Sequence, residues 1–501
     1  MARLIGAAGL GTAGAAIFGV EWMKSPRKPP PGHPQKNRVV PENKLPGSTE
    51  WRVGFADTRA ADDIAMQIKG FASTTSAVAG ERVDFHVTVA AAEQFDVGVY
   101  RLGWYEGAGA RQIATSPKLM GVSQPAPDLD ADTGMISCKW GRSWSVSVKS
   151  HWVPGAYLAV FTTVSGWRSY APFVVHDPKR RGGLCAVLPF STYQAYNQWP
   201  FDGVTGKNLY YGYDADAKLS FDRRANQVSF DRPYYKDGMP KLFADDHSFI
   251  QWAEKTGFDL NYASTTDIES GRLDPTRSTG VIFPGHDEYW SPTMRDWADR
   301  AVSAGTSLAY LGANNVYWKV KFDPSTDGRE HRVVTCYKTG HDPVVVDSAT
   351  MRWRDGFPGP VDAEQAFLGV QYNGIVKGRS PLIVQNASHW FWEGCEVADG
   401  DEIPRMVGIE ADGLNLEYKV PTDGTQTLLS SSPYTSTYGD TLVQNTSLRE
   451  TSNGALLFVA GTLCWTKGLA ADGYRNWRLM RATKNLLKRM AKPVPPASTI
   501  V

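Results

Sequence analysis

The sequence has 501 residues, of which 42% are hydrophobic and 21% are charged, and its formal net charge is +1. This length and balance predict a globular protein of roughly two to four domains. Because the charge is almost zero and no basic stripe or charged tail is present, the sequence argues against a nucleic-acid-binding protein.

The N-terminal segment, residues 1–41, indicates export. A single arginine precedes a Gly/Ala/Leu run from Leu4 to Val20, and Ala13-Gly14-Ala15 is a candidate cleavage site. The run is too short and too glycine-rich for a transmembrane helix, and the Pro-rich stretch 25–37 predicts an extended linker. We expect an exported or cell-envelope protein with at most a transient membrane anchor; a disordered leader on a cytoplasmic protein is the alternative.

Residues 42–178 predict a β-sandwich, because apolar and polar residues alternate in short runs. The alternation is clear in VDFHVTV, FDVGV and WSVSV, at positions 83–89, 95–99 and 144–148. Turn residues separate these runs and no helical period lies between them, which is typical of an antiparallel, immunoglobulin-like sandwich. The polar, glycine-ended stretch 176–183 marks the end of this domain.

Residues 179–501 change to strand–helix alternation. Apolar runs at 184–190, 258–263, 279–284 and 306–312 predict buried strands. A helix is expected over 245–257, and another begins with Ser291 as N-cap and Pro292 at its first position. Buried strands that alternate with helices indicate a parallel, doubly wound sheet.

The last part of the chain is expected to add an insertion and a closing helix. The segment from about 344 to 460 is aromatic and β-like, so we expect a β-rich insertion in the α/β domain. Residues 473–490 predict an amphipathic helix that packs back on the sheet.

Polar side chains follow each of the four predicted strands. In open α/β sheets, ligands bind outside the carboxyl ends of the strands, so these side chains are candidates for one site. In chain order they are Tyr193 and Tyr196, then Asp267, then His286, Asp287 and Glu288, and last Asn314 and Asn315.

The stretch GHDE, residues 285–288, has the form of a nucleophile elbow but lacks a nucleophile. No Ser or Cys stands where that turn needs one, which argues against an acyl-enzyme mechanism. A carboxylate beside an imidazole suits metal ligation or acid–base chemistry instead. Asp287 is expected to face away and brace the turn.

Zinc is disfavoured as the metal, because the sequence has no HExxH motif and no two histidines at zinc-ligand spacing. Tyrosine is plentiful nearby, and phenolate is a hard anionic ligand that suits Fe(III). Most of these tyrosines are expected to be packing residues: Tyr193, Tyr196, Tyr210, Tyr211, Tyr213, Tyr234 and Tyr235.

The five cysteines are far apart and form no CxxC pair, which excludes a zinc ribbon and a dithiol redox motif. We expect buried thiols, with one disulfide as the alternative in an exported chain: Cys138, Cys185, Cys336, Cys395 and Cys464.

Eight ordered motifs resemble the N,N-dimethylformamidase large (beta) subunit family, from about residue 42 to 465. They are ENKLPGSTEW, IKGFASTTSAVAGERVDFHV, VYRLGWYEGAGAR, TYQAYN, VSFDRPY, GHDEYWS, LGANNVYWKV and ASHWFWEG. The resemblance implies a metal-dependent amidohydrolase in which a sandwich domain precedes a domain like the class I glutamine amidotransferases. It also implies one Fe(III) held by two tyrosinates and one glutamate.

The resemblance assigns metal ligands motif by motif. Glu288 of GHDE matches the glutamate, and His286 would support it from beside the metal. Tyr196 of QAYN matches the first tyrosinate. Tyr234 of FDRPY is our choice for the second, with Tyr210 of NLYYGY as its rival.

The same resemblance supplies the remaining roles. Asn314 of GANN matches an active-site amide that would hydrogen-bond the oxyanion, and Glu393 of HWFWEG is a candidate acidic partner. His286 or Glu393 would move protons. The substrate would be a small-molecule amide, and a small-subunit partner or a homo-oligomer is expected.

Two other readings of the sequence remain open. The chain could be an exported, non-catalytic protein that binds envelope polysaccharide through its Trp-rich loops. It could also be a hydrolase that uses another metal or a pair of carboxylates, as glycosidases do.

Overall fold

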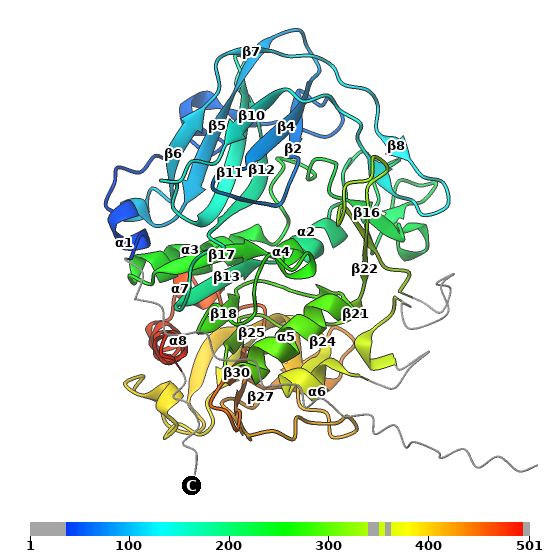
Figure 1. The fold of residues 1–501 in the computed structure, drawn as a ribbon. Coiled ribbons are helices and arrows are strands. Elements are labelled where there is room, and N and C mark those ends of the chain that lie inside the picture. Colours follow the sequence, from blue (N-terminus) through cyan, green and yellow to red (C-terminus); the bar gives the residue numbers. More distant parts are fainter. Residues whose placement is uncertain (1–36, 339–349, 356–361, 494–501) are drawn as a thin grey trace, which may run out of the picture. The chain divides into compact units, whose positions relative to one another are not determined.

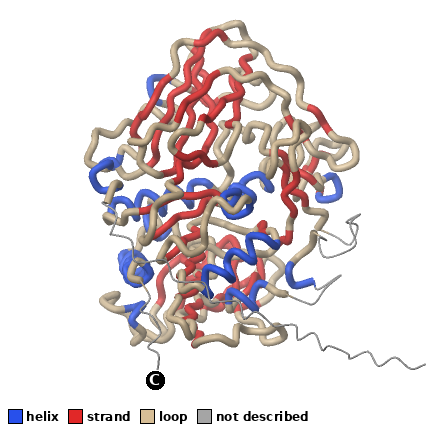
Figure 2. The backbone as a smooth tube through the Cα atoms, in the orientation of Figure 1, coloured by secondary structure: helices blue, strands red, loops and turns tan. Residues whose placement is uncertain are grey.

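The computed structural model describes residues 37–338, 350–355 and 362–493 (Figure 1). The expected export signal and nearly all of the linker, residues 1–36, lie outside the described residues. In the described part, no helix has both the length and the apolar character needed to cross a membrane. The fold is mixed α/β and rich in strands, as the sequence predicts, and strands and loops outnumber helices along the backbone (Figure 2).

The first part of the chain forms two facing sheets. A three-stranded sheet has the order β10-β4-β2, and a seven-stranded sheet is centred on β12, β11 and β5, which pair antiparallel. The strands of the smaller sheet are β2 (Ile68–Ala72), β4 (Arg82–Val89) and β10 (Trp144–Ser147). Those of the larger sheet are β1 (Arg59–Ala60), β3 (Ser76–Val78), β5 (Gln94–Leu102), β6 (Ala110–Thr115), β7 (Leu119–Met120), β11 (Gly155–Thr163) and β12 (Trp167–His176).

The alternation seen in the sequence builds the core between these sheets. Val83, Phe85 and Val87 of β4 are buried, and they share one cluster with Phe161 of β11 and Phe173 of β12. Because successive strand residues point to opposite faces, a period of two buries one face of each sheet. The three strands predicted from alternation are confirmed.

The second part contains a seven-stranded sheet of order β17-β13-β18-β20-β30-β29-β26. The first five strands are parallel, and β29 and β26 are antiparallel to their neighbours. The strands are β13 (Leu184–Leu188), β17 (Leu260–Ser264), β18 (Gly280–Phe283), β20 (Ser307–Tyr310), β26 (Thr425–Leu428), β29 (Ser447–Glu450) and β30 (Leu456–Val459).

Helices cover both faces of this sheet, which explains why its strands are apolar along their whole length. Leu188 and Ile282 belong to one core cluster with residues of α3 and α8, whereas Val187 and Phe283 belong to another with residues of α5. The helices are α2 (Phe190–Ala195), α3 (Phe243–Lys255), α4 (Thr265–Glu269), α5 (Pro292–Ser303), α6 (Glu364–Leu368), α7 (Lys467–Ala470) and α8 (Trp477–Met490), and a short α1 (Val39–Glu42) precedes the sandwich.

In the segment expected as an insertion, about 344 to 460, residues 344–349 and 356–361 lie outside the described residues, and the rest contributes to the sheet, to two hairpins and to the short helix α6. Strands β26, β29 and β30 extend the main sheet, since apolar residues such as Leu457 and Val459 are buried in it. The hairpins are β24 (Gln371–Ile383) with β25 (Glu402–Gly413), and β27 (Ser432–Thr435) with β28 (Thr441–Gln444). In the described part of the expected insertion, the two hairpins form β-sheets separate from the main sheet.

Short strands connect these parts. They are β8 (Asp128–Leu129), β9 (Ile136–Ser137), β14 (Gly212–Tyr213), β15 (Leu219–Ser220), β16 (Gln227–Ser229), β19 (Tyr289–Trp290), β21 (Trp318–Lys319), β22 (Lys321–Asp323) and β23 (Val333–Thr335). All five cysteines are free and buried, as expected for thiols used in packing.

Candidate functional site

The GHDE turn follows β18 and is fixed from two sides. A Cβ at Gly285 would lie 2.5 Å from the Asp246 carboxylate oxygens, so only glycine fits there. The Glu288 N–H donates to Thr192 Oγ1 at 3.0 Å, which ties the turn to α2. The sequence thus places Glu288 at the carboxyl edge of the sheet, beside α2. Tyr196 is the C-cap residue of that helix.

Glu288 is the centre of a polar cluster, and its side chain is fully buried. Tyr196 Oη donates to its Oε2 at 2.7 Å, and Tyr210 Oη donates to its Oε1. Asn314 Nδ2 adds a longer bond of 3.3 Å to Oε1. A buried carboxylate is costly unless it is hydrogen-bonded, and these three donors supply that compensation.

Asn314 reaches the cluster from the loop after β20. Its φ is 53°, a left-handed conformation that asparagine adopts more readily than most residues. Its N–H donates to Asp412 Oδ1 at 2.7 Å, and its Nδ2 donates to Glu410 Oε2 at 3.0 Å. The Asn314 side-chain amide was expected to hydrogen-bond an oxyanion. In the structure it donates to two carboxylates, those of Glu288 and Glu410.

His286 lies between the same two carboxylates. Its Nε2 is 3.6 Å from Glu288 Oε2 and 3.5 Å from Glu410 Oε2. Among the described residues, neither ring nitrogen has a hydrogen-bond partner, and Asn314 Oδ1 also lacks one. Both residues are buried, so these unpartnered polar atoms are available to hydrogen-bond a further ligand of the cluster.

Two residues of the site were missed by the sequence analysis. Glu410 comes from β25, in the hairpin, and no motif marks it. Lys338 places its Nζ 3.4 Å from the ring centroid of Tyr210 and 3.9 Å from that of Trp318, and it donates to Tyr289 Oη at 2.6 Å. In the sequence its one adjacent aromatic residue is Tyr337, which is too weak a signal to mark a site residue.

Burial governs the electrostatics of the cluster. Burial, reinforced by the Glu288 charge, raises the pKa of both Tyr196 and Tyr210 well above the usual value. Burial also raises the pKa of Glu410, with the nearby His286 acting in the opposite direction. For Lys338, burial lowers the pKa to about 7. In the protein alone the two phenols are therefore neutral donors.

The residues present fit a hard metal cation. Two phenols and a carboxylate converge, and a cation among them would favour the phenolate forms that burial disfavours. Within the described ranges, no group of three His, Cys, Asp or Glu side chains is arranged to hold a metal. A metal site here therefore depends on tyrosine oxygens.

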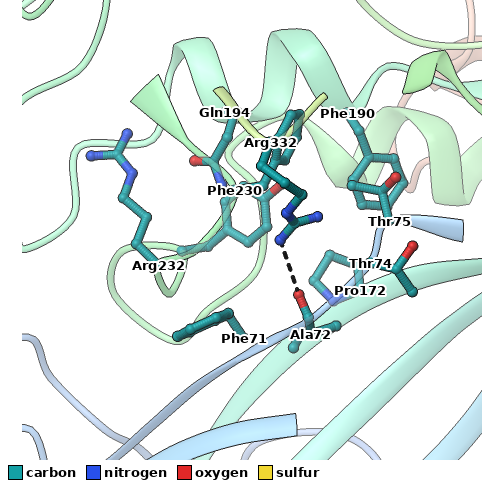
Figure 3. A pocket seen from close by; sticks show the side chains of 12 residues that line it. Phe71, Ala72, Thr74, Thr75, Pro172, Phe190, Gln194, Phe230, Arg232 and Arg332 are labelled. Atoms are coloured by element: carbon teal, nitrogen blue, oxygen red, sulfur yellow. Dashed lines mark hydrogen bonds between the residues drawn. The ribbon is translucent and has the colours of Figure 1, made fainter. Parts of the chain in front are cut away.

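The structure does not bring Tyr234 or Glu393 into this cluster. Tyr234 is buried, its hydroxyl has no described hydrogen-bond partner, and it lines a separate cavity of about 20 Å³. Figure 3 shows that cavity, where Phe230 and Phe190 form part of the wall and Arg332 donates to the Ala72 carbonyl. Tyr210, the rival, lies at Glu288 instead.

Glu393 is exposed, and its backbone carbonyl accepts hydrogen bonds from Arg481 and Asn485 of α8. The loop that carries Glu393 therefore packs against α8. None of the contacts described for Glu393 involves Glu288. Asp287 is fully buried, and burial raises its pKa to about 8, with the nearby Trp290 indole acting in the opposite direction. The turn is braced by its backbone, since Val316 N–H donates to the Asp287 carbonyl at 2.9 Å.

Comparison with known proteins gives a match over most of the chain. The family described as N,N-dimethylformamidase beta subunit-like, C-terminal, matches residues 96–477. The N,N-dimethylformamidase beta subunit of Paracoccus aminophilus is 25% identical over 306 residues, covering 53% of this chain and 39% of that protein. The beta subunit from an Alcaligenes species is 25% identical over 425 residues, covering 72% of this chain and 55% of that protein.

Less than two thirds of either relative's length is therefore matched by this chain. A solved structure, the superoxide reductase (neelaredoxin) from Ignicoccus hospitalis, matches at 9% identity over 23% of this chain and 81% of that one. Its TM-score of 0.14 is too low to indicate a shared fold.

Proposed function

Because this chain belongs to the N,N-dimethylformamidase beta subunit-like family, we propose that it is a metal-dependent amidohydrolase that cleaves the C–N bond of a linear amide. The observation that carries the proposal is the Glu288 cluster. Two tyrosine hydroxyls meet the two oxygens of one buried carboxylate, with an imidazole and a second carboxylate beside them.

Tyr196, Tyr210 and Glu288 would hold one Fe(III). Phenolate and carboxylate oxygens are hard ligands, and the tyrosine-rich donor set favours iron over zinc. Tyr210 takes the place that the sequence analysis gave to Tyr234, because its hydroxyl lies on Glu288. When bound, the ion would polarise the amide carbonyl and lower the pKa of water.

The protein's own residues would orient the reactants and move the proton. Hydrolysis adds water oxygen to the carbonyl carbon, breaks the C–N bond and transfers one proton from water to the leaving nitrogen. Glu410 would accept the proton from water, since its partly exposed carboxylate lies beside His286 and burial raises its pKa. His286, whose Nε2 is 3.5 Å from Glu410, would pass a proton to the leaving nitrogen.

Asn314 and Lys338 would hold this arrangement in place. Asn314 Nδ2 bridges Glu410 and Glu288, which fixes the distance between the acid–base group and the ligand. Lys338 lies against the Tyr210 ring and donates to Tyr289, and Trp318 Nε1 donates to Tyr210 Oη at 2.9 Å. The contacts of Lys338 and Trp318 with Tyr210 restrict the orientation of this tyrosine.

The finer features of the chain belong to the same proposal. We assign the two facing sheets, residues 42–178, to an immunoglobulin-like domain and residues 179–501 to an amidotransferase-like domain. The relatives are named as beta subunits, which supports a partner subunit or an oligomer for this chain. Export is supported by the composition of residues 1–20.

The test is metal content and colour of the full-length protein after expression with iron supplied. We expect about one iron per chain and a visible tyrosinate-to-iron band, both lost in Glu288→Ala. Colourless, iron-free wild-type protein would refute the iron assignment. Hydrolysis of a panel of formamides and peptide amides, followed by release of amine, tests the reaction; release of reducing sugar from glycans would favour the glycosidase-like alternative.

A further inference from the structure

A basic side chain lies beside the partly exposed residues of the Glu288 cluster. Glu288 is fully buried, whereas Tyr196 and Tyr210 are half-buried and the Glu410 side chain is 17% exposed, so solvent reaches the cluster at these three side chains. Lys241, which precedes α3, is exposed on this side, and its Nζ lies 5.5 Å from the ring centroid of Tyr196.

Lys241 forms no direct ion pair with another described residue. In the described part of the chain, no carboxylate forms an ion pair with Lys241 or with Arg379, another exposed basic residue near the site. The third basic side chain, Lys467, is paired with Asp245, whose pKa also responds to the charges of Arg379 and His286. Of these three basic side chains, only Lys467 forms a direct ion pair among the residues that the structure describes.

The contact with Tyr196 does not by itself explain Lys241. A distance of 5.5 Å is near the outer limit of about 6 Å for a cation–π contact, and such contacts are weak at exposed positions. A lysine held only by a ring keeps all three N–H donors available to a ligand. The same ammonium is close enough to favour the charged form of Glu410, which lowers the pKa of that carboxyl.

We propose that the substrate carries a carboxylate next to its scissile amide, as an N-acyl amino acid does, and that Lys241 binds this carboxylate. The inference rests on the proposed function and adds the substrate class to it. An ammonium–carboxylate contact is a charge-assisted hydrogen bond, which is stronger than a neutral one. In the complex, the substrate carboxylate would contact the Lys241 ammonium.

The experiment compares two substrates that differ in charge and little in shape, N-formylglycine and N-isobutylformamide. We expect the wild-type protein to hydrolyse N-formylglycine with the higher kcat/KM. In Lys241→Met, we expect the KM for N-formylglycine to rise about 10-fold or more, with the KM for N-isobutylformamide unchanged. Lys241→Arg should keep most of the discrimination, since it keeps the charge.

Lys255→Met is the matched control. Lys255, the last residue of α3, is also exposed and lies over an aromatic ring, with its Nζ 4.3 Å from the Trp104 centroid. It removes the same charge at a position away from the cluster, so it should leave both KM values as in the wild type. An equal change for both substrates in Lys241→Met would show that the lysine only supports Tyr196, and would overturn the inference.

A binding arm separates this inference from the proposed function. If the wild type hydrolyses neither amide, calorimetric titration measures the binding of N-formylglycine and so tests the inference without activity. Binding that is lost in Lys241→Met and kept in Lys255→Met supports carboxylate recognition, although the proposed activity has failed. Absence of binding, or equal binding by both variants, overturns the inference, as does a wild-type preference for N-isobutylformamide.

Discussion

Glu288 owes its burial to the side chains that donate to it. A carboxylate without partners in a protein interior is strongly unfavourable, and here two phenols and an amide supply donors. The oxygens of the two phenols are the metal ligands of the proposed function. The cluster is thus stable as a hydrogen-bonded network without a metal, and under the proposed function it would also hold one.

The first prediction concerns the choice between two tyrosines. Tyr210→Phe removes a hydroxyl that lies on Glu288, so we expect loss of most bound iron and of the visible band. Tyr234→Phe removes a buried hydroxyl without a described partner, so iron content and colour should stay as in the wild type. Metal analysis and absorption spectra of both variants check this; the reverse pattern would restore Tyr234 as the ligand.

The second prediction concerns Glu410. Glu410→Gln keeps an acceptor for Asn314 but cannot take a proton, so we expect kcat to fall about 100-fold or more with little change in KM. Iron content should be retained, because Glu410 is assigned no ligand role. Steady-state kinetics on an active amide, with metal analysis as control, measure this; a parallel loss of iron would make Glu410 a ligand.

The third prediction concerns pH and Asp412. Burial raises the pKa of Asp412 to about 8, above the value of about 3.9 in an unfolded chain. The neutral carboxyl therefore stabilises the fold fully below pH ~4, and this contribution is lost as the pH rises through ~8. In Asp412→Asn, thermal stability should fall less between pH 5 and 8 than in the wild type; identical pH profiles would contradict this.

Helix termini show how local sequence fixes the elements around the site. Ser291 accepts a hydrogen bond from Met294 N–H and Pro292 begins α5, as the sequence predicts. At α8, the Asn476 side chain accepts from the N–H groups of Arg478 and Leu479. Such caps satisfy donors that no helical carbonyl can reach, so their residue types are readable without tertiary information.

The fourth prediction uses the cap of α8. Asn476→Ala leaves two helix N–H groups without their acceptor, and we expect the free energy of unfolding to fall by about 1 kcal/mol. Asn476→Ser, which can also cap, should recover most of the loss. Chemical denaturation measures both variants; equal destabilisation by serine and alanine would rule out capping as the cause.

The sandwich is joined to the α/β part by a buried ion pair. Arg101 of β5 and Glu254 of α3 are both fully buried, with Nη2 and Oε1 2.7 Å apart. Glu254 also accepts hydrogen bonds from Tyr262 Oη and Asn43 Nδ2. This network connects the N-terminal segment, the seven-stranded sheet of the sandwich, α3 and the parallel sheet. The sandwich and the α/β part are therefore expected to unfold together.

The fifth prediction tests that connection. Arg101→Met leaves the Glu254 charge buried without its partner, so we expect about 3–5 kcal/mol of destabilisation. The control is Asp472→Asn, which removes an exposed pair with Arg475 and should cost less than about 1 kcal/mol. Denaturation followed by fluorescence checks both; a small effect of Arg101→Met would mean that the junction depends on apolar packing.

Much of the fold follows from local patterns. The strand at 82–89, the parallel strands of the sheet and the α5 cap were all predicted, because alternation and capping depend on neighbouring residues. The segment 344–460 was less accessible, since its strands pair with partners far away in sequence. A β-strand pattern alone does not say which sheet the strand joins.

The motifs and the strand pattern are enough to predict that Tyr196, Glu288, His286 and Asn314 meet, because the carboxyl ends of parallel strands share one edge of the sheet. The three-dimensional structure was needed to show that Tyr210 lies on Glu288 while Tyr234 lines another cavity, and that Glu410 and Lys338 complete the site. Those residues come from a loop and a hairpin. Their paths depend on packing between distant segments, for which the sequence has no local period or motif.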